Sequence, residues 1–83
     1  MPYIKVEDRY CLLKEGSPPQ TAGELNFMFT RLAMDYLAIQ GKNYSTLNTV
    51  VGALECAKQG FYRRVIVPYE NIKLEENGDV YHV

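Results

Sequence analysis

The sequence predicts a mainly α domain of the α+β class: a small bundle of two long helices and a short N-terminal helix, with a C-terminal β-hairpin. Three observations predict this fold. Apolar residues recur every three or four positions over residues 21–40 and 45–67, which is the spacing of one helix face. Gly16-Ser17-Pro18-Pro19 separates a shorter segment that precedes them. Asn77-Gly78 is the preferred pair of a two-residue hairpin turn.

The first twenty residues predict an extended start and a short helix. Pro2 restricts its neighbours, so residues 1–5 are expected to be extended. Residues 6–15 predict a helix in which Tyr10 and Leu13 share one face. The glycine and prolines that follow are expected to end it.

The second helix has the best start signal in the chain. Thr21 followed by Glu24 is a capping box, and Gly41 supplies the stop, so the helix is expected to end near Gln40. Its main apolar face is expected to contain Leu25, Met28, Phe29, Leu32, Tyr36 and Ile39.

A second apolar stripe on this helix contains Phe27, Met34 and Leu37. One small core cannot absorb both stripes, so we expect the second one to form an interface between subunits. The alternative is that these residues are scattered surface hydrophobes, which are common.

Ser45 is the expected N-cap of the third helix. One face of that helix carries Leu47, Val50, Val51, Leu54, Phe61 and Val65. Pro68 is expected to end or kink the helix near Val67. Beyond it, a hairpin about Asn77-Gly78 would place Leu74 opposite Tyr81, with residues 2–5 as a third strand. The alternative is a short helix from Pro68 that ends at Gly78.

Composition restricts the classes of function. The 83 residues predict one domain, 1–83, and the net charge of -1 argues against duplex nucleic acid as a partner. No apolar run is long enough to span a membrane, and no secretory signal is present, so we expect a cytoplasmic protein. Cys11, Cys56 and His82 show no metal-ligand spacing, so neither a metal nor a cofactor is expected.

Lys58 lies inside the apolar stripe of the third helix, where a lysine is costly unless it is paired. The first interpretation is a lysine that snorkels to water or forms a salt bridge, with Glu55 three residues earlier or Glu24 of the neighbouring helix as the partner. The second is a cation that lines a pocket or an interface.

The residues after Lys58 combine cations with tyrosines. Tyr62, Arg63, Arg64 and Tyr69 suit a phosphate or carboxylate held by arginine beneath a stacked ring. The alternative is a solvated basic helix end that complements the helix dipole. Polar strips on the two long helices add the further candidates Asn26, Arg31 and Asn48, with Asn26–Thr30 and Arg31–Asp35 as local pairs.

Several short motifs together resemble one protein family. They are Pro2-Tyr3-Ile4-Lys5, Glu7-Asp8-Arg9, Gly23-Glu24-Leu25-Asn26, Thr30-Arg31, Leu54-Glu55, Phe61-Tyr62-Arg63-Arg64, Pro68-Tyr69-Glu70 and Glu76-Asn77-Gly78-Asp79-Val80-Tyr81. The set is similar to a family of short proteins of unknown function that phages, prophages and their bacterial hosts encode. The resemblance spans almost the whole chain and supplies no catalytic residue.

These observations lead to one functional expectation and two alternatives. We expect a non-catalytic homo-oligomer of phage type that binds or sequesters a nucleotide-like anion, by analogy with small phage proteins, some of which sequester host immune signalling nucleotides. A protein–protein interaction module of unknown partner is the first alternative, and a structural protein is the second. An enzyme is not expected, because catalytic constellations are nearly absent from the sequence.

Overall fold

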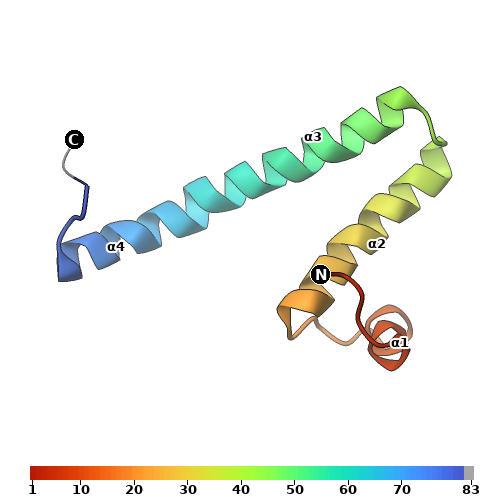
Figure 1. The fold of residues 1–83 in the computed structure, drawn as a ribbon, viewed down its shortest axis with the longest axis horizontal. Helices are drawn as coiled ribbons and strands as arrows, with labels where there is room; N and C mark the ends of the chain where they lie inside the picture. Colours follow the sequence, from red (N-terminus) through yellow and green to blue (C-terminus); the bar gives the residue numbers. More distant parts are fainter. Residues whose placement is uncertain (82–83) are drawn as a thin grey trace. The chain divides into compact units, whose positions relative to one another are not determined.

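In the computed structural model, which describes residues 1–81, the chain is helical and has no strand in that range. Its helices are α1 Val6–Lys14, α2 Ala22–Gln40, α3 Tyr44–Phe61 and α4 Val67–Asn77, with a π-helical turn, η1 Tyr62–Ile66, between the last two (Figure 1). The chain divides into two compact units, Met1–Val50 and Val51–Val83. The mainly α prediction is confirmed, and the predicted β-hairpin is wrong.

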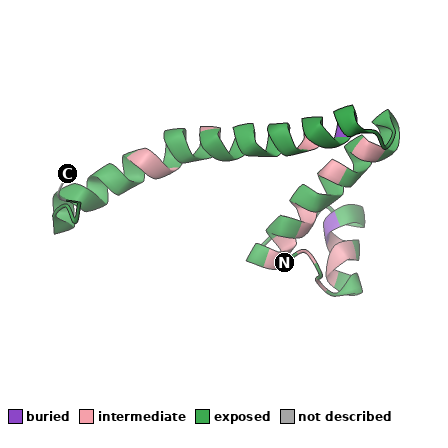
Figure 2. Cartoon of the chain, turned by 45° about the horizontal axis from the view of Figure 1, so that its top comes forward, coloured by how far each residue is buried: buried purple, intermediate pink, exposed green. Residues whose placement is uncertain are grey.

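The first unit is organised around the packing of α1 against α2. Leu12 of α1 is its one buried hydrophobic residue, at 5% exposure, among the residues described (Figure 2). Arg9 donates from Nε to the Ile4 carbonyl at 3.0 Å, and its guanidinium lies 5.8 Å from the centre of the Phe27 ring. One side chain therefore ties the N-terminal segment and α1 to α2.

The ends of α2 are the ones that the sequence predicts. Thr21 Oγ1 accepts a hydrogen bond from the Glu24 amide at 3.1 Å, and Glu24 Oε1 accepts one from the Gln20 amide at 3.1 Å. The first bond satisfies an amide that a helix start leaves without a partner, and the second ties the residue before the cap to the first turn. Gly41 ends the helix at φ +90°, a conformation that favours glycine, and donates to the Leu37 carbonyl at 2.9 Å.

Neither apolar stripe of α2 is uniformly buried: Met28 of the expected core face is half-buried, and so are two residues of the stripe assigned to an interface. Phe27 and Leu37, assigned to an interface, are half-buried, while Met34 is 55% exposed. Of the expected core face, Leu32 and Ile39 are 72% and 80% exposed. The physical reason lies in α1, because its Arg9 contacts the Phe27 side of α2.

The start of α3 differs from the prediction by one capping residue. Asn43, not Ser45, is the cap: its Oδ1 accepts from the Thr46 amide at 2.9 Å, and the helix begins at Tyr44. Thr46 is buried at 7% exposure. Asparagine and serine cap equally well, so sequence alone could not choose between them.

Helix continues through Pro68, where a hairpin strand was expected. Pro68 lies in the first turn of α4, directly after the π-turn η1, whose wider backbone separates the proline ring from the carbonyls before it. Gly78 ends α4 at φ +87°, and its amide donates to the Leu74 carbonyl at 2.8 Å. Asn77 is helical, whereas a type I′ turn would need positive φ at this residue too. The short-helix alternative is therefore the one observed; His82 and Val83 lie outside the described residues.

Candidate functional site

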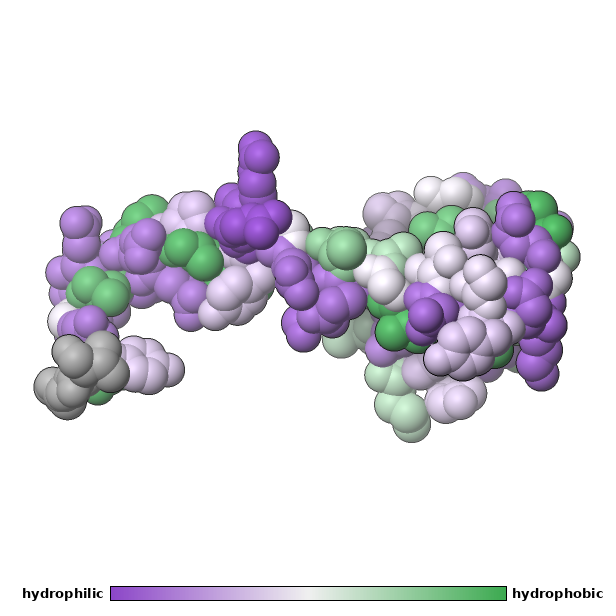
Figure 3. Space-filling model, turned by 90° about the horizontal axis from the view of Figure 1, so that it is seen from above, coloured by the Kyte–Doolittle hydropathy of each residue, from purple (hydrophilic) through white to green (hydrophobic). Residues whose placement is uncertain are grey.

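The second unit has an apolar face that no other helix of that unit covers. Leu54, Phe61, Tyr69 and Ile72 are 46%, 60%, 60% and 54% exposed. Together with Ala57 they lie three, four or seven residues apart within α3 and within α4. We call these five residues the seam. In Figure 3, hydrophobic side chains stand among hydrophilic ones along α4.

The π-turn keeps the two halves of the seam on one face. Leu54 and Phe61 are seven residues apart, but Phe61 and Tyr69 are eight apart. In η1 the Val67 amide donates to the Tyr62 carbonyl, five residues back, so the turn holds one residue more than an α-turn. The extra residue compensates for the longer spacing.

A hydrogen bond across η1 shows the same alignment. The Tyr62 hydroxyl donates to Glu70 Oε1 at 3.3 Å, although the two residues are eight positions apart. In an uninterrupted α-helix, residues seven apart lie nearly in line, whereas residues eight apart are turned by about 80° from each other. The π-turn therefore brings eight-apart residues into line.

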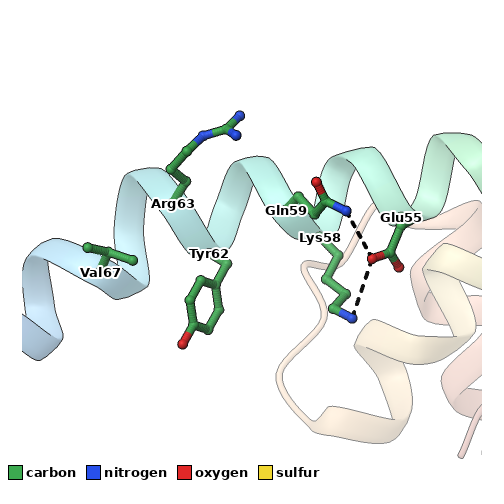
Figure 4. Close-up of a pocket in the computed structure, with 6 residues that line it drawn as sticks. All are labelled: Glu55, Lys58, Gln59, Tyr62, Arg63 and Val67. Atoms are coloured by element: carbon green, nitrogen blue, oxygen red, sulfur yellow. Dashed lines mark hydrogen bonds and ion pairs between the residues drawn. The ribbon is translucent and has the colours of Figure 1, made fainter. Parts of the chain in front are cut away.

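Some of the predicted binding residues meet at one shallow depression beside the π-turn. It is lined by Glu55, Lys58, Gln59, Tyr62, Arg63 and Val67 (Figure 4). Lys58 Nζ lies 3.6 Å from Glu55 Oε1, and Gln59 donates to the same oxygen at 3.2 Å. The salt-bridge interpretation of Lys58 is thus the one observed, with its side chain 73% exposed.

The depression does not gather every predicted cation. Figure 4 shows Arg63 pointing away from the side of the helix on which Lys58 and Tyr62 lie. Arg64 does not line the depression, and Tyr69 lines a second one near the end of α4. Lys73 Nζ lies 5.7 Å from the centre of the Tyr69 ring and 3.2 Å from Glu76. Tyr62 and Tyr69 are therefore engaged by neighbours along the same helical run.

The remaining predicted site residues belong to the first unit. Asn26 accepts from the Thr30 hydroxyl through its carbonyl at 2.9 Å, and Arg31 pairs with Asp35 at 3.1 Å, so both predicted local pairs are confirmed. Asn48 is exposed on α3. Each of these interactions is local to its own helix.

Two searches of residues 1–81 concern metal ligands and membrane-spanning helices. No group of three or more histidine, cysteine or carboxylate side chains lies close enough there to hold a metal ion. None of the helices in that range has the length and apolar character needed to cross a bilayer. Cys11 is half-buried, Cys56 is exposed, and both are free thiols.

Sequence reasoning missed the seam as one continuous feature. The signal in the sequence is that the three-residue spacing of Leu54 and Ala57 recurs at Tyr69 and Ile72, one position later than a seven-residue repeat requires. Pro68 within that pattern predicts an end or a kink of the helix, whereas the structure has a widened turn there. The π-turn places the apolar residues of α3 and those of α4 on one face.

Comparisons with curated proteins and with solved structures give no match. A family model described as a domain of unknown function, DUF6899, matches residues 1–80. The match covers nearly the whole chain and agrees with the resemblance to an uncharacterised family that the sequence motifs carry. The chain therefore belongs to the DUF6899 family.

Proposed function

We propose that this chain is a non-catalytic protein-association module whose working surface is the seam of the second unit. The observation that supports it is the exposure of the large seam side chains on a helical run that no other helix of the same unit covers. An exposed apolar face of this kind is typical of a surface that binds another protein.

The energetics of isolated helices also favour a partner for the seam. An isolated helix is only marginally stable in water, and most helical stability in proteins comes from packing an amphipathic face. The local interactions along α3 and α4, such as the exposed Lys58–Glu55 and Lys73–Glu76 pairs, contribute at most about 0.5 kcal/mol each. The helical run therefore needs a partner surface on its seam.

The test is to place a charge on the seam. Phe61→Asp combined with Ile72→Asp should abolish association, because two desolvated carboxylates cannot be paired in an apolar interface. Size-exclusion chromatography with light scattering would measure self-association, and pull-down would measure a second protein. Val80→Asp is the matched control: Val80 is 78% exposed and lies beyond the end of α4. Unchanged association in the seam double variant would refute the proposal.

Binding of a nucleotide-like anion is the second candidate. It is favoured by one observation, that Lys58 and Tyr62 lie on the same side of the helix at the depression beside the π-turn. A second reason is the phage origin that the sequence resemblance implies, because a phage protein that sequesters a host signalling nucleotide would use such a site. The Lys58–Glu55 pair would have to open to admit a phosphate.

Calorimetry with pyrophosphate and with a cyclic dinucleotide tests this candidate. Lys58→Gln should lower the affinity at least tenfold if the depression holds a phosphate. Lys73→Gln is the control, because Lys73 lies outside that depression. Absence of binding by the unaltered protein to both probes would remove the candidate.

A further inference from the structure

We infer that the partner on the seam is a second copy of this chain, running antiparallel to the first, with the two-fold axis beside the π-turn. This inference rests on the proposed function and names its partner. Three observations carry it: the charge polarity of the second unit, the charge pattern of α2, and the layers that the seam forms with itself.

Charge is distributed unevenly along the second unit. Residues 51–66 carry three cations and one anion, whereas residues 67–81 carry one cation and four anions. A parallel pair would set the basic halves side by side and the acidic halves side by side. An antiparallel pair sets each basic half against an acidic half, which electrostatic complementarity favours.

The chain's own α2 offers no such complement. Its charged residues are Glu24, Arg31 and Asp35. Glu24 is engaged in the capping box, and Arg31 pairs with Asp35 at 3.1 Å. The charges on α2 are therefore not complementary to a helical run that is basic at one end and acidic at the other. A reversed copy of that run is complementary to it at both ends.

The seam also forms consistent layers with its reversed copy. In α3, Leu54 and Phe61 are first positions of a seven-residue repeat, and Ala57 is a fourth position. When the extra residue of the π-turn is not counted, Tyr69 is again a first position and Ile72 a fourth. In an antiparallel pair, first positions meet fourth positions. Phe61 of one copy then faces Ile72 of the other.

The same register assigns roles to two cations. The layer next to Phe61 joins Ala57 of one copy to Glu76 of the other, beside Lys58, so the acidic end meets a lysine. The layer nearest the axis joins Arg64 to Tyr69, a pairing that suits a guanidinium on an aromatic face. Both contacts occur twice, as two-fold symmetry requires.

Disulfide trapping distinguishes the two orientations. In a Cys11→Ala, Cys56→Ser background, Ala57→Cys and Glu76→Cys proteins are prepared singly, mixed and oxidised in air. A disulfide needs Cα atoms within about 7 Å. Two Ala57 sites in the antiparallel pair are about 27 Å apart, from eighteen helical steps of about 1.5 Å each. We therefore expect dimers that contain one copy of each variant and none from Ala57→Cys alone.

The opposite results would overturn the inference. Cross-linking of Ala57→Cys with itself, and not with Glu76→Cys, would show parallel pairing. A monomer by light scattering at 100 μM would exclude the second copy. If that monomer still bound another protein and lost it with the Phe61→Asp and Ile72→Asp double variant, the proposed function would stand without this partner; if it bound none, both would fail. Circular dichroism of each cysteine variant checks that the helices are retained.

Discussion

At the scale of single residues, Arg9 joins three parts of the first unit. Its Nε donates to the Ile4 carbonyl at 3.0 Å, and its guanidinium lies over the ring of Phe27. Leu12 is the one buried hydrophobic residue of the described chain, so these polar contacts carry an unusual share of the packing of α1 on α2. Glu7-Asp8-Arg9 was noticed in the sequence only as a motif, because the partner of Arg9 is eighteen residues away.

Arg9→Ala should destabilise the first unit by about 1–2 kcal/mol, from the loss of one hydrogen bond and one cation–π contact. Urea unfolding followed by circular dichroism measures the change. Arg31→Ala is the control: its pair with Asp35 is 51% and 53% exposed, so we expect less than about 1 kcal/mol. Equal losses for the two variants would contradict the role given to Arg9.

Glycines of the two units should respond oppositely to alanine. A Cβ on Gly23 would meet Ile4 Cγ2 at 3.1 Å and the Met1 carbonyl at 3.3 Å, so Gly23→Ala should displace the N-terminal segment and lower stability. A Cβ on Gly52 would meet nothing within 4 Å, so Gly52→Ala should add up to about 1 kcal/mol of helix propensity. Thermal unfolding of both variants checks the difference in sign, and a stabilised Gly23→Ala protein would contradict the close approach of residues 1–4.

At the scale of elements, capping residues and glycines predicted most helix ends. They failed at Asn77-Gly78, a pair that is compatible with both a helix end and a hairpin turn. Thr21 with Glu24 and Gly41 are unambiguous, because capping boxes and terminal glycines act within one turn. Asn77-Gly78 is ambiguous: glycine at positive φ ends a helix as readily as it closes a hairpin. The depression beside the π-turn was predicted only in part, since Arg63 lies away from Tyr62 and Lys58. The direction of a side chain near η1 depends on a turn that residue spacing alone does not specify.

Substitutions at residues 77 and 78 distinguish the two structures. Asn77→Ala should leave stability unchanged or raise it slightly, because Asn77 is helical and alanine is the better helix former. In a type I′ turn the same change would be destabilising. Gly78→Ala should cost about 1 kcal/mol, because alanine is strained at φ +87°. Far-ultraviolet circular dichroism through thermal unfolding measures both, and a loss caused by Asn77→Ala would contradict the helix end.

At the scale of the whole molecule, stability should depend on association. The large seam residues are roughly half exposed, and a helix that lacks a packed face is marginal in water. The sequence predicted an oligomer, which stays a prediction, but it assigned the interface to Phe27, Met34 and Leu37 of α2. The contact of α1 with Phe27 and the exposed seam of the second unit shift that proposal to α3 and α4.

The free energy of unfolding should therefore rise with protein concentration. For a dimer that folds as it associates, each tenfold increase in concentration adds about 1.4 kcal/mol per mole of dimer. Urea midpoints at 2, 20 and 200 μM measure this. The Phe61→Asp and Ile72→Asp double variant should show no such dependence in its second unit. Midpoints that stay constant for the unaltered protein would contradict coupled folding and association.

The surplus residue held by the π-turn has a consequence for chain length among relatives. Removing one residue between positions 62 and 67 closes the turn into α geometry and leaves α4 in phase with α3. A deletion elsewhere in residues 54–77 turns all that follows by about 100°. With the turn closed, the ring of Pro68 would meet the carbonyl four residues earlier. Length differences in the family should thus cluster at this point, and members one residue shorter there should lack the proline.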